Sequence, residues 1–226
     1  MATSSKSRSR ASAGSETPFG WARRVCNPVV TGFAENWIAV NSAMIDGMTR
    51  TRFDVSEGAE LRQDGHYLVL ANHQSGVDIL VLQKIFNRRI PFLRFFLKRQ
   101  LIWVPVLGLC WWALDFPFMG RYSHRQVAKH PELGKRDMEA TRRACEKFRA
   151  VPVAIMNFVE GTRFTPEKHA SQSSPYRRLL KPKSGGVAFV IDAMGDSLHA
   201  ILDVTIAYPG GRPSIMDLIA GRIPEV

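Results

Sequence analysis

Hydrophobic and polar positions are arranged along the chain so that strands and helices are predicted in turn. Four short apolar runs have the length of buried strands: residues 67–71, 92–97, 153–159 and 201–208. Three longer segments have helical spacing: residues 77–86, 131–149 and 183–194. Strands that alternate with helices are typical of α/β architecture. We therefore predict a single α/β domain in which a mixed β-sheet is flanked by helices.

Two further apolar segments fit this pattern less clearly. Residues 21–49 mix apolar with small polar side chains and are expected to be helical in part. Residues 101–114 are apolar but contain a proline and a glycine, and they are shorter than the roughly 20 residues that span a bilayer. Three tryptophans within this run, with Lys98 and Arg99 before it, suit either a membrane interface or a core helix.

Composition adds a strong positive charge to this picture. The chain has 226 residues, 45% of them hydrophobic, which is enough for one sizeable core. Its net charge of +11 indicates an anionic partner, such as an anionic membrane, a phosphate-bearing substrate or a nucleic acid. The Ser-rich segment 1–18 carries three basic residues and is predicted to be a disordered tail, with a transit peptide as the alternative. Three scattered cysteines match no zinc-type spacing, so no metal is expected.

The first candidate for chemistry follows the first predicted strand. His73 and Asp78 are separated by four residues, and Gly76 between them permits a sharp turn. A carboxylate on one imidazole nitrogen fixes the tautomer and leaves the other nitrogen free as a base. Such a histidine can take the proton from a substrate hydroxyl that attacks a carbonyl. The alternative is structural, with His73 in an ordinary loop and Asp78 near a helix start.

Two other stretches carry isolated cations beside apolar residues. Glu160-Gly-Thr-Arg163 follows a predicted strand, where Gly161 allows a close backbone approach and Arg163 can bind phosphate through two nitrogens. Thr162 offers a hydroxyl, and Glu160 could hold Arg163 or bind a substrate hydroxyl. Phe116–Arg121 ends an apolar segment with a glycine and an arginine. By itself each stretch is also compatible with a plain strand-to-loop turn.

The order and spacing of the three stretches together resemble one known family. The sequence Asn-His-x4-Asp, then Phe116–Arg121, then Phe-x-Glu-Gly-Thr-Arg is similar to the 1-acyl-glycerol-3-phosphate acyltransferases. The apolar stretch 201–209 is similar to a fourth family motif, so the resemblance covers roughly residues 65–210. Residues 96–105 and 145–149 look like the bacterial YihG-type branch and its lysocardiolipin-acyltransferase relatives.

The resemblance implies an acyltransferase that moves a fatty acyl group to a hydroxyl of a lysophospholipid such as lysophosphatidic acid. The donor would be acyl-CoA or acyl carrier protein, and no cofactor or metal is implied. His73 would be the general base and Asp78 would orient it. Gly161, Thr162 and Arg163 would hold the acceptor phosphate, supported by Glu160, with Arg121 and Lys98 as further cations. Positions near Trp103 and Trp111 would accept acyl chains, and backbone groups near Ser75 and Gly76 would stabilise the oxyanion.

The chain departs from the family pattern at both ends. Residues 19–226 would form the acyltransferase domain, with the polar tail where relatives carry an apolar segment, and with a C-terminus that suggests truncation. The expected location is a membrane surface, the cytoplasmic face of the inner membrane if the protein is bacterial. No nucleic-acid partner is expected, because no recognition-helix or zinc-finger pattern is present.

Three alternative functions stay open on the sequence. Gly195-Asp-Ser-Leu198 spells a serine-esterase signature, although it lies near the C-terminus and is followed closely by the last histidine. A basic module that binds nucleic acid or anionic membrane without catalysis is compatible with the charge. A lipid-binding pseudoenzyme is the third, and it gains weight if the chain is truncated.

Overall fold

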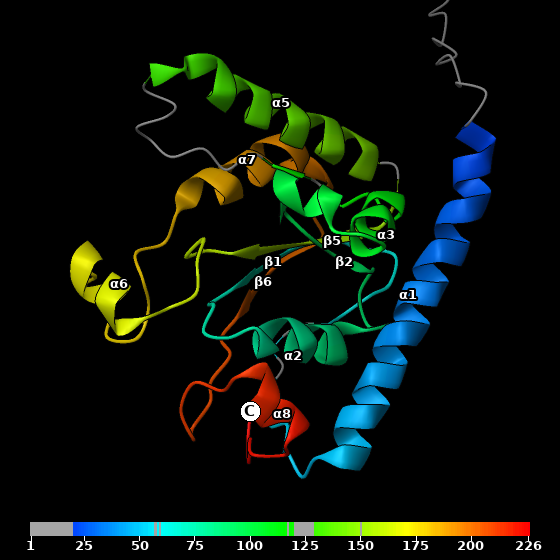
Figure 1. Cartoon of the computed structure of the whole chain (residues 1–226). Helices are drawn as coiled ribbons and strands as arrows, with labels where there is room; N and C mark the ends of the chain where they lie inside the picture. The colour runs from blue at the N-terminus through cyan, green and yellow to red at the C-terminus, as the bar shows by residue number, and fades with distance from the viewer. Residues whose placement is uncertain (1–19, 57, 59, 117, 120–128, 150) are drawn as a thin grey trace, which may run out of the picture.

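The computed structural model describes residues 20–226 except 57, 59, 117, 120–128 and 150 (Figure 1). Its strands are β1 (His66–Ala71), β2 (Leu93–Phe95), β3 (Leu97–Lys98), β4 (Phe118–Met119), β5 (Val153–Phe158) and β6 (Ala200–Val204). The α-helices are α1 (Gly20–Met48), α2 (Val77–Phe86), α3 (Leu107–Ala113), α5 (Pro131–Phe148), α6 (Pro166–Gln172), α7 (Ser184–Met194) and α8 (Ile215–Ile219). Two 3₁₀ helices are η1 (Arg99–Trp103) and η2 (Gly195–Ser197). The predicted tail and Arg121 lie outside the described residues.

Four strands form the central sheet in the order β2-β5-β1-β6. The pairings of β1 with β5, β1 with β6 and β2 with β5 are all parallel. β3 and β4 form a separate parallel pair. The predicted α/β fold with a sheet flanked by helices is confirmed, and the described pairings are parallel rather than mixed.

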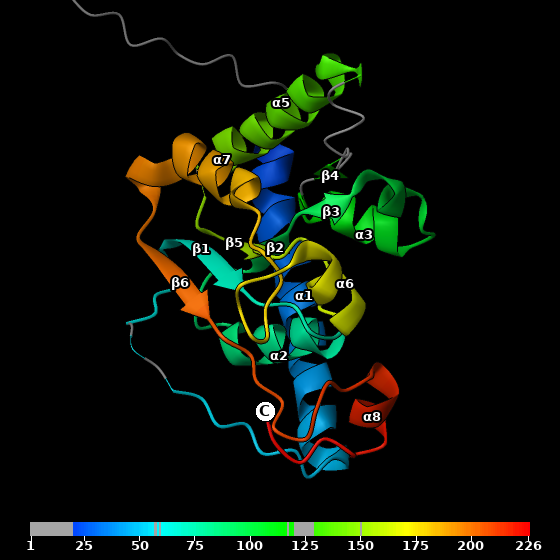
Figure 2. The ribbon, with the colours of Figure 1, turned by 90° about the vertical axis from the view of Figure 1, so that its left-hand side faces the viewer.

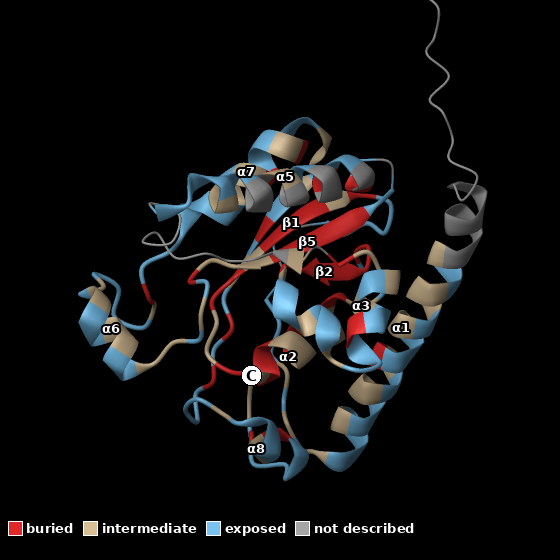
Figure 3. Cartoon of the chain, turned by 45° about the horizontal axis from the view of Figure 1, so that its top comes forward, coloured by how far each residue is buried: buried red, intermediate tan, exposed pale blue. Residues whose placement is uncertain are grey.

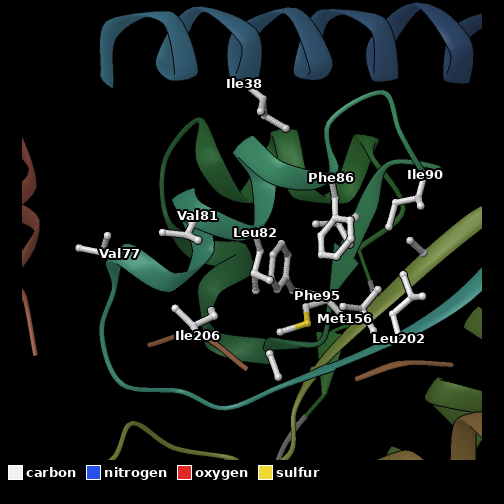
Figure 4. Packing of buried hydrophobic residues seen from close by; sticks show 14 of the residues in the cluster. Ile38, Val77, Val81, Leu82, Phe86, Ile90, Phe95, Met156, Leu202 and Ile206 are labelled. Carbon is white, nitrogen blue, oxygen red and sulfur yellow. The ribbon is translucent and has the colours of Figure 1, made fainter. Parts of the chain in front are cut away.

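Side chains alternate between the two faces of the sheet and so divide the core into two layers. In β1, Tyr67, Val69 and Ala71 join the cluster beneath α1 and α2, whereas Leu68 faces the cluster formed with α5 and α7. This period of two is what a strand buried on both faces requires. Figure 3 shows the strands of the sheet buried, with exposed residues on α7 and α3, and Figure 4 shows the cluster beneath α1 and α2.

The N-terminal segment, expected to be helical in part, forms one helix from Gly20 to Met48 with Pro28 inside it. Among its residues whose burial is described, only Ile38 is fully buried. Asp46 near its C-terminal end pairs with Lys84 of α2 at 2.6 Å. Helix α1 therefore lies along the domain (Figure 1), and many of its side chains whose burial is described are exposed.

The apolar run 101–114 folds as two short helices, η1 and α3, rather than one. Between them Val106 has a positive φ of 62°. A Cβ at Gly108 would lie 2.0 Å from the carbonyl oxygen of Ile102, so only glycine fits this return of the chain. Trp103 is 85% exposed whereas Trp111 packs against the core, so the segment combines a surface part and a core part.

The loops that follow β1 and β5 reach the same edge of the sheet, because parallel strands place their carboxyl ends together. Figure 2 shows α3, α6 and α8 on the side to which the arrowheads of β1 and β6 point. Ala71 and Phe158, the last residues of β1 and β5, are directly paired. The segments that carry His73 and Arg163 therefore start from neighbouring points.

Candidate active site

His73 and Asp78 form a hydrogen-bonded pair at the carboxyl edge of the sheet. His73 Nδ1 lies 2.9 Å from Asp78 Oδ2, and Asp78 is completely buried. His73 lies in the loop after β1, while Asp78 lies in the first turn of α2, whose positive dipole end favours a carboxylate. The loop of four intervening residues thus brings the two side chains together, as the sequence predicted.

The carboxylate of Asp78 accepts four hydrogen bonds. Oδ2 accepts from His73 and from the backbone N–H groups of Gln74 at 2.6 Å and Ser75 at 2.9 Å. Oδ1 accepts from the Tyr208 hydroxyl at 2.6 Å. Burial by itself raises the pKa of the Asp78 carboxyl, but the bonds from His73, Ser75, Tyr208 and Gln74 outweigh it and lower the pKa below its ordinary value.

This arrangement determines which nitrogen of His73 can act as a base. An ionised Asp78 can only accept, so Nδ1 carries the proton and Nε2 keeps its lone pair. The ring stacks on Phe158 with 3.8 Å between centroids and an interplanar angle of 15°. Within the described part of the chain Nε2 has no hydrogen-bond partner. The imidazole is therefore held in one orientation with its basic nitrogen available.

Glu160 is a buried link between two segments of the site. One carboxylate oxygen accepts from the backbone N–H of His73 at 2.8 Å and the other from that of Leu180 at 2.7 Å. The residue is 1% exposed. The sequence suggested that Glu160 holds Arg163 or binds a substrate hydroxyl. Both of its oxygens instead accept hydrogen bonds from backbone N–H groups, so Glu160 fixes the positions of the two segments.

The turn after β5 presents Thr162 and Arg163 at the surface. Gly161 has φ 67°, a conformation that favours glycine. Lys168 of α6 donates from Nζ to the Thr162 hydroxyl at 2.8 Å and to the Arg163 carbonyl oxygen at 3.0 Å. The Arg163 guanidinium is exposed and forms no hydrogen bond or ion pair with another described residue. It is available for an anionic ligand.

A cavity of about 690 Å³ connects these groups. It is lined by His73 and by three cations, Lys98, Arg163 and Lys183. Lys98 and Arg163, which the resemblance implied as phosphate-binding residues, thus lie at one cavity with His73. A cavity of this size, lined by apolar walls and a few convergent polar groups, is typical of small-molecule sites.

Lys183 lines the cavity but was not among the candidate residues that the sequence suggested. It lies directly before α7, and its aliphatic chain would be 3.1 Å from a Cβ at Gly161. A cation at a helix N-terminus is disfavoured by the helix dipole unless an anion lies nearby. The run Lys-Pro-Lys-Ser-Gly-Gly at the start of the helix predicted over residues 183–194 was therefore a usable signal.

The apolar wall of the cavity comes from other residues than those predicted. It includes Phe95, Phe96 and Met156. Trp103 and Trp111 were expected to accept acyl chains, but neither lines this cavity.

Two other expectations change with the geometry. The Ser75 backbone N–H was a candidate oxyanion donor, but it is bonded to Asp78 and so is not free for that task.

Ser197 of the esterase-like stretch lies in η2 before β6, at the opposite edge of the parallel sheet from His73. A serine at that edge cannot use His73 as its base. Among the described residues no group of three or more His, Cys, Asp or Glu could hold a metal ion.

Known proteins resemble this chain over most of its length. It is 23% identical over 220 residues to mouse "1-acyl-sn-glycerol-3-phosphate acyltransferase epsilon", covering 88% of this chain and 54% of that protein. It is 26% identical over 221 residues to mouse "Lysocardiolipin acyltransferase 1", covering 91% of this chain and 54% of that protein. It is 27% identical over 187 residues to Arabidopsis thaliana "1-acyl-sn-glycerol-3-phosphate acyltransferase 3", covering 76% of this chain and 46% of that protein. The chain thus spans about half the length of these curated relatives.

Among solved structures, the acyltransferase PlsC from Thermotoga maritima matches with a TM-score of 0.45 and 17% identity, covering 79% of this chain and 58% of that one. The family model described as Acyltransferase matches residues 52–209, which include both members of the His73–Asp78 pair and the turn that carries Arg163. Because this match spans well over half of the chain, the chain belongs to the acyltransferase family.

Proposed function

We propose that the chain transfers a fatty acyl group from acyl-CoA or acyl carrier protein to a hydroxyl of a lysophospholipid such as lysophosphatidic acid. The observation that carries the proposal is one cavity in which an oriented base, His73, faces three cations. A base next to cations suits a substrate that bears both a hydroxyl and a phosphate. The relatives, which are named as acyltransferases of 1-acyl-glycerol-3-phosphate and lysocardiolipin, agree with this class.

The reaction is a single displacement. His73 Nε2 takes the proton from the acceptor hydroxyl while its oxygen attacks the thioester carbonyl carbon. The tetrahedral intermediate collapses, the carbon–sulfur bond breaks, and the imidazolium returns its proton to the leaving thiolate. Asp78 stabilises the transient imidazolium without itself accepting the proton. No covalent bond to the protein is needed, because the substrate supplies the nucleophile.

The cations have a separate task, which is to bind the acceptor phosphate. Arg163 offers several donors in a planar fork, and Lys98 and Lys183 add compact charges from two other segments. The apolar wall formed by Phe95, Phe96 and Met156 would take the first part of an acyl chain. One cavity would then hold the polar and the apolar parts of a lysophospholipid on either side of His73.

A transfer assay with labelled acyl-CoA and lysophosphatidic acid tests this function. We expect His73→Ala to lower kcat by about 10²-fold or more, as the loss of a general base does. Arg163→Ala should raise the KM for the acceptor and leave that for acyl-CoA nearly unchanged. Ser197→Ala is the matched control and should keep full activity. A fully active His73→Ala variant would refute the mechanism, and an unchanged acceptor KM in Arg163→Ala would remove its phosphate role.

We also propose that the protein works at a membrane surface, because its substrate would be a lipid. Helix α1 carries a continuous line of exposed apolar side chains at helical spacing: Val29, Phe33, Trp37, Val40, Met44 and Met48. Exposed apolar patches of this kind mark interaction sites. None of the helices formed by the described residues is long and apolar enough to cross a membrane. An amphipathic helix lying on the surface is consistent with both findings.

Co-sedimentation with phospholipid vesicles tests the membrane proposal. The double variant Phe33→Ser with Trp37→Ser should bind vesicles at least several-fold more weakly than the unmodified chain. Ile191→Ser with Ile201→Ser is the matched control, since these side chains are also exposed but lie on α7 and β6. Equal loss in both pairs, or no loss in the α1 pair, would contradict docking through α1.

A further inference from the structure

Tyr208 contacts the oxygen of Asp78 that does not face His73. Its hydroxyl donates to Asp78 Oδ1 at 2.6 Å, while Oδ2 faces the imidazole. Both residues are buried, Tyr208 being 8% exposed. A short bond to a buried carboxylate is among the stronger hydrogen bonds in proteins. Burial and the bond to Asp78 raise the pKa of the phenol far above its usual range, so Tyr208 stays protonated and remains the donor.

The segment after β6 that carries Tyr208 is fixed to the loop that carries His73. Asn72 donates to the carbonyl oxygen of Ile206 at 2.9 Å and accepts from its N–H at 2.7 Å. The Ser75 hydroxyl donates to the carbonyl oxygen of Pro213 at 2.6 Å. These bonds hold the segment on both sides of Tyr208. The position of the phenol relative to Asp78 is therefore set by the backbone.

We propose that Tyr208 is a positioning residue for the reaction, which holds the Asp78 carboxylate in place and shares its charge through the chain Tyr208–Asp78–His73. The inference rests on the proposed role of His73 as general base. Without the phenol, Oδ1 of the buried Asp78 carboxylate would lose its side-chain donor. The carboxylate would then carry more negative charge, and its electrostatic effect on the imidazole would be larger. Orientation and basicity of His73 would both change.

Among the described residues, the other charged groups near His73 form no hydrogen bond with the Tyr208 hydroxyl, which bonds to Asp78. Glu160 lies at the His73 backbone N–H, and the three cations of the cavity, Lys98, Arg163 and Lys183, come from other segments. A change in the titration of His73 upon substitution of Tyr208 therefore reports on the bond to Asp78.

The first test is Tyr208→Phe, which keeps the ring and removes the hydroxyl. We expect kcat to fall about tenfold while the KM values of donor and acceptor stay within about twofold, because Tyr208 does not line the cavity that holds His73 and the three cations. The acidic limb of the pH profile of kcat/KM should move to higher pH by about half a unit or more, since a more negative partner makes His73 more basic. Insertion of 3-fluorotyrosine at this position should move the limb in the opposite direction, because the more acidic phenol draws more charge from Asp78.

Tyr67→Phe is the matched control. Tyr67 is also a buried tyrosine of the core, but its hydroxyl accepts from the backbone N–H of Arg62 at 2.8 Å. Its loss should lower stability and leave kcat and the pH profile unchanged. If Tyr208→Phe behaves as Tyr67→Phe does, the inference is overturned. The fluorinated protein keeps the hydroxyl, so it provides the decisive pH shift even if Tyr208→Phe does not fold.

The outcome is separable from that of the proposed function. An inactive His73→Ala variant combined with an unaltered Tyr208→Phe variant would overturn the role of Tyr208 alone. A fully active His73→Ala variant would overturn the general-base mechanism and the role of Tyr208 with it.

Discussion

At the scale of single residues, Glu160 shows how a buried carboxylate can serve a site without touching substrate. Its two oxygens accept backbone N–H groups from His73 and Leu180, which come from different segments. A carboxylate is suited to this because it offers only acceptors. The arrangement places the base and the segment that leads to Lys183 in a fixed relation.

We predict that Glu160→Gln lowers both stability and activity. The amide would turn one donor group toward a backbone N–H, and an unsatisfied buried donor costs about 1–3 kcal/mol. Urea unfolding measures the loss, and the acyl-transfer assay measures the accompanying fall in kcat. Glu146→Gln is the control, because Glu146 is an exposed partner of Arg142 and such pairs contribute less than about 1 kcal/mol. Equal stability of the two variants would contradict the role of Glu160.

Asp78 gives a prediction about pH. Its pKa in the folded protein is below the ordinary value of 3.8, so the unfolded chain binds the proton more readily. The stability that Asp78 contributes is complete above about pH 4 and is lost as the pH falls through the folded pKa. Asp78→Asn should therefore be less stable than the unmodified chain at pH 7, and the difference in free energy of unfolding should shrink in acid. Urea unfolding at several pH values tests this, and a difference that grows in acid would refute it.

The sequence predicted the contact between His73 and Asp78 but not all of the residues around this pair. His73 and Asp78 are close in sequence, so a local pattern could predict their contact. Lys183 and Tyr208 reach the site only through the fold, one before α7 and the other after β6. The cation at the start of a predicted helix marked Lys183 as unusual, but no local spacing links Lys183 or Tyr208 to His73, so only the structure shows that they lie near it.

At the scale of elements, the sequence predicted those with regular patterns. Helix α2 was expected at residues 77–86 and is found there. Helices α6 and α8 were not predicted, because each is short and without a clear apolar face. Their caps were the available signal: Thr165 accepts from Lys168 before α6, and Ser214 forms a capping box with Asp217 before α8.

Two glycines, one in the turn after β5 and one in α7, allow a test of the backbone geometry near the site. Gly161 has φ 67°, and a Cβ there would meet the Lys183 side chain at 3.1 Å. Gly161→Ala should cost about 1–2 kcal/mol of stability and raise the acceptor KM by moving Lys183. Gly185→Ala, in the first turn of α7 with open space around it, should instead stabilise by up to about 1 kcal/mol and leave activity unchanged. Thermal unfolding and kinetics distinguish the two, and a harmless Gly161→Ala variant would contradict the proposed contact.

At the scale of the whole molecule, the parallel sheet explains why distant segments form one site. Strands β1, β5 and β6 run in the same direction, so the segments that follow them begin at one edge (Figure 2). His73, Arg163 and Tyr208 each lie a few residues beyond one of these strands. The fold thereby brings together, from three parts of the chain, the residues proposed as the base, the phosphate-binding cation and the positioning hydroxyl.

The net charge of +11 leads to a prediction about how the molecule meets a membrane. Attraction to an anionic bilayer is screened by salt, since the Debye length falls from about 10 Å at 0.1 M to about 3 Å at 1 M. Apolar contacts made by the exposed line on α1 are not screened in this way. We therefore expect binding to phosphatidylglycerol vesicles to weaken as salt rises and to level off above zero.

The two contributions can be separated by co-sedimentation across a salt series. Neutral phosphatidylcholine vesicles should show only the salt-resistant part. The variant with Phe33→Ser and Trp37→Ser should lose that part on both kinds of vesicle and keep the salt-sensitive attraction to phosphatidylglycerol. Binding that is equally strong on both lipids at low salt would contradict the electrostatic contribution. If the variant still binds vesicles at high salt, α1 does not supply the apolar contribution.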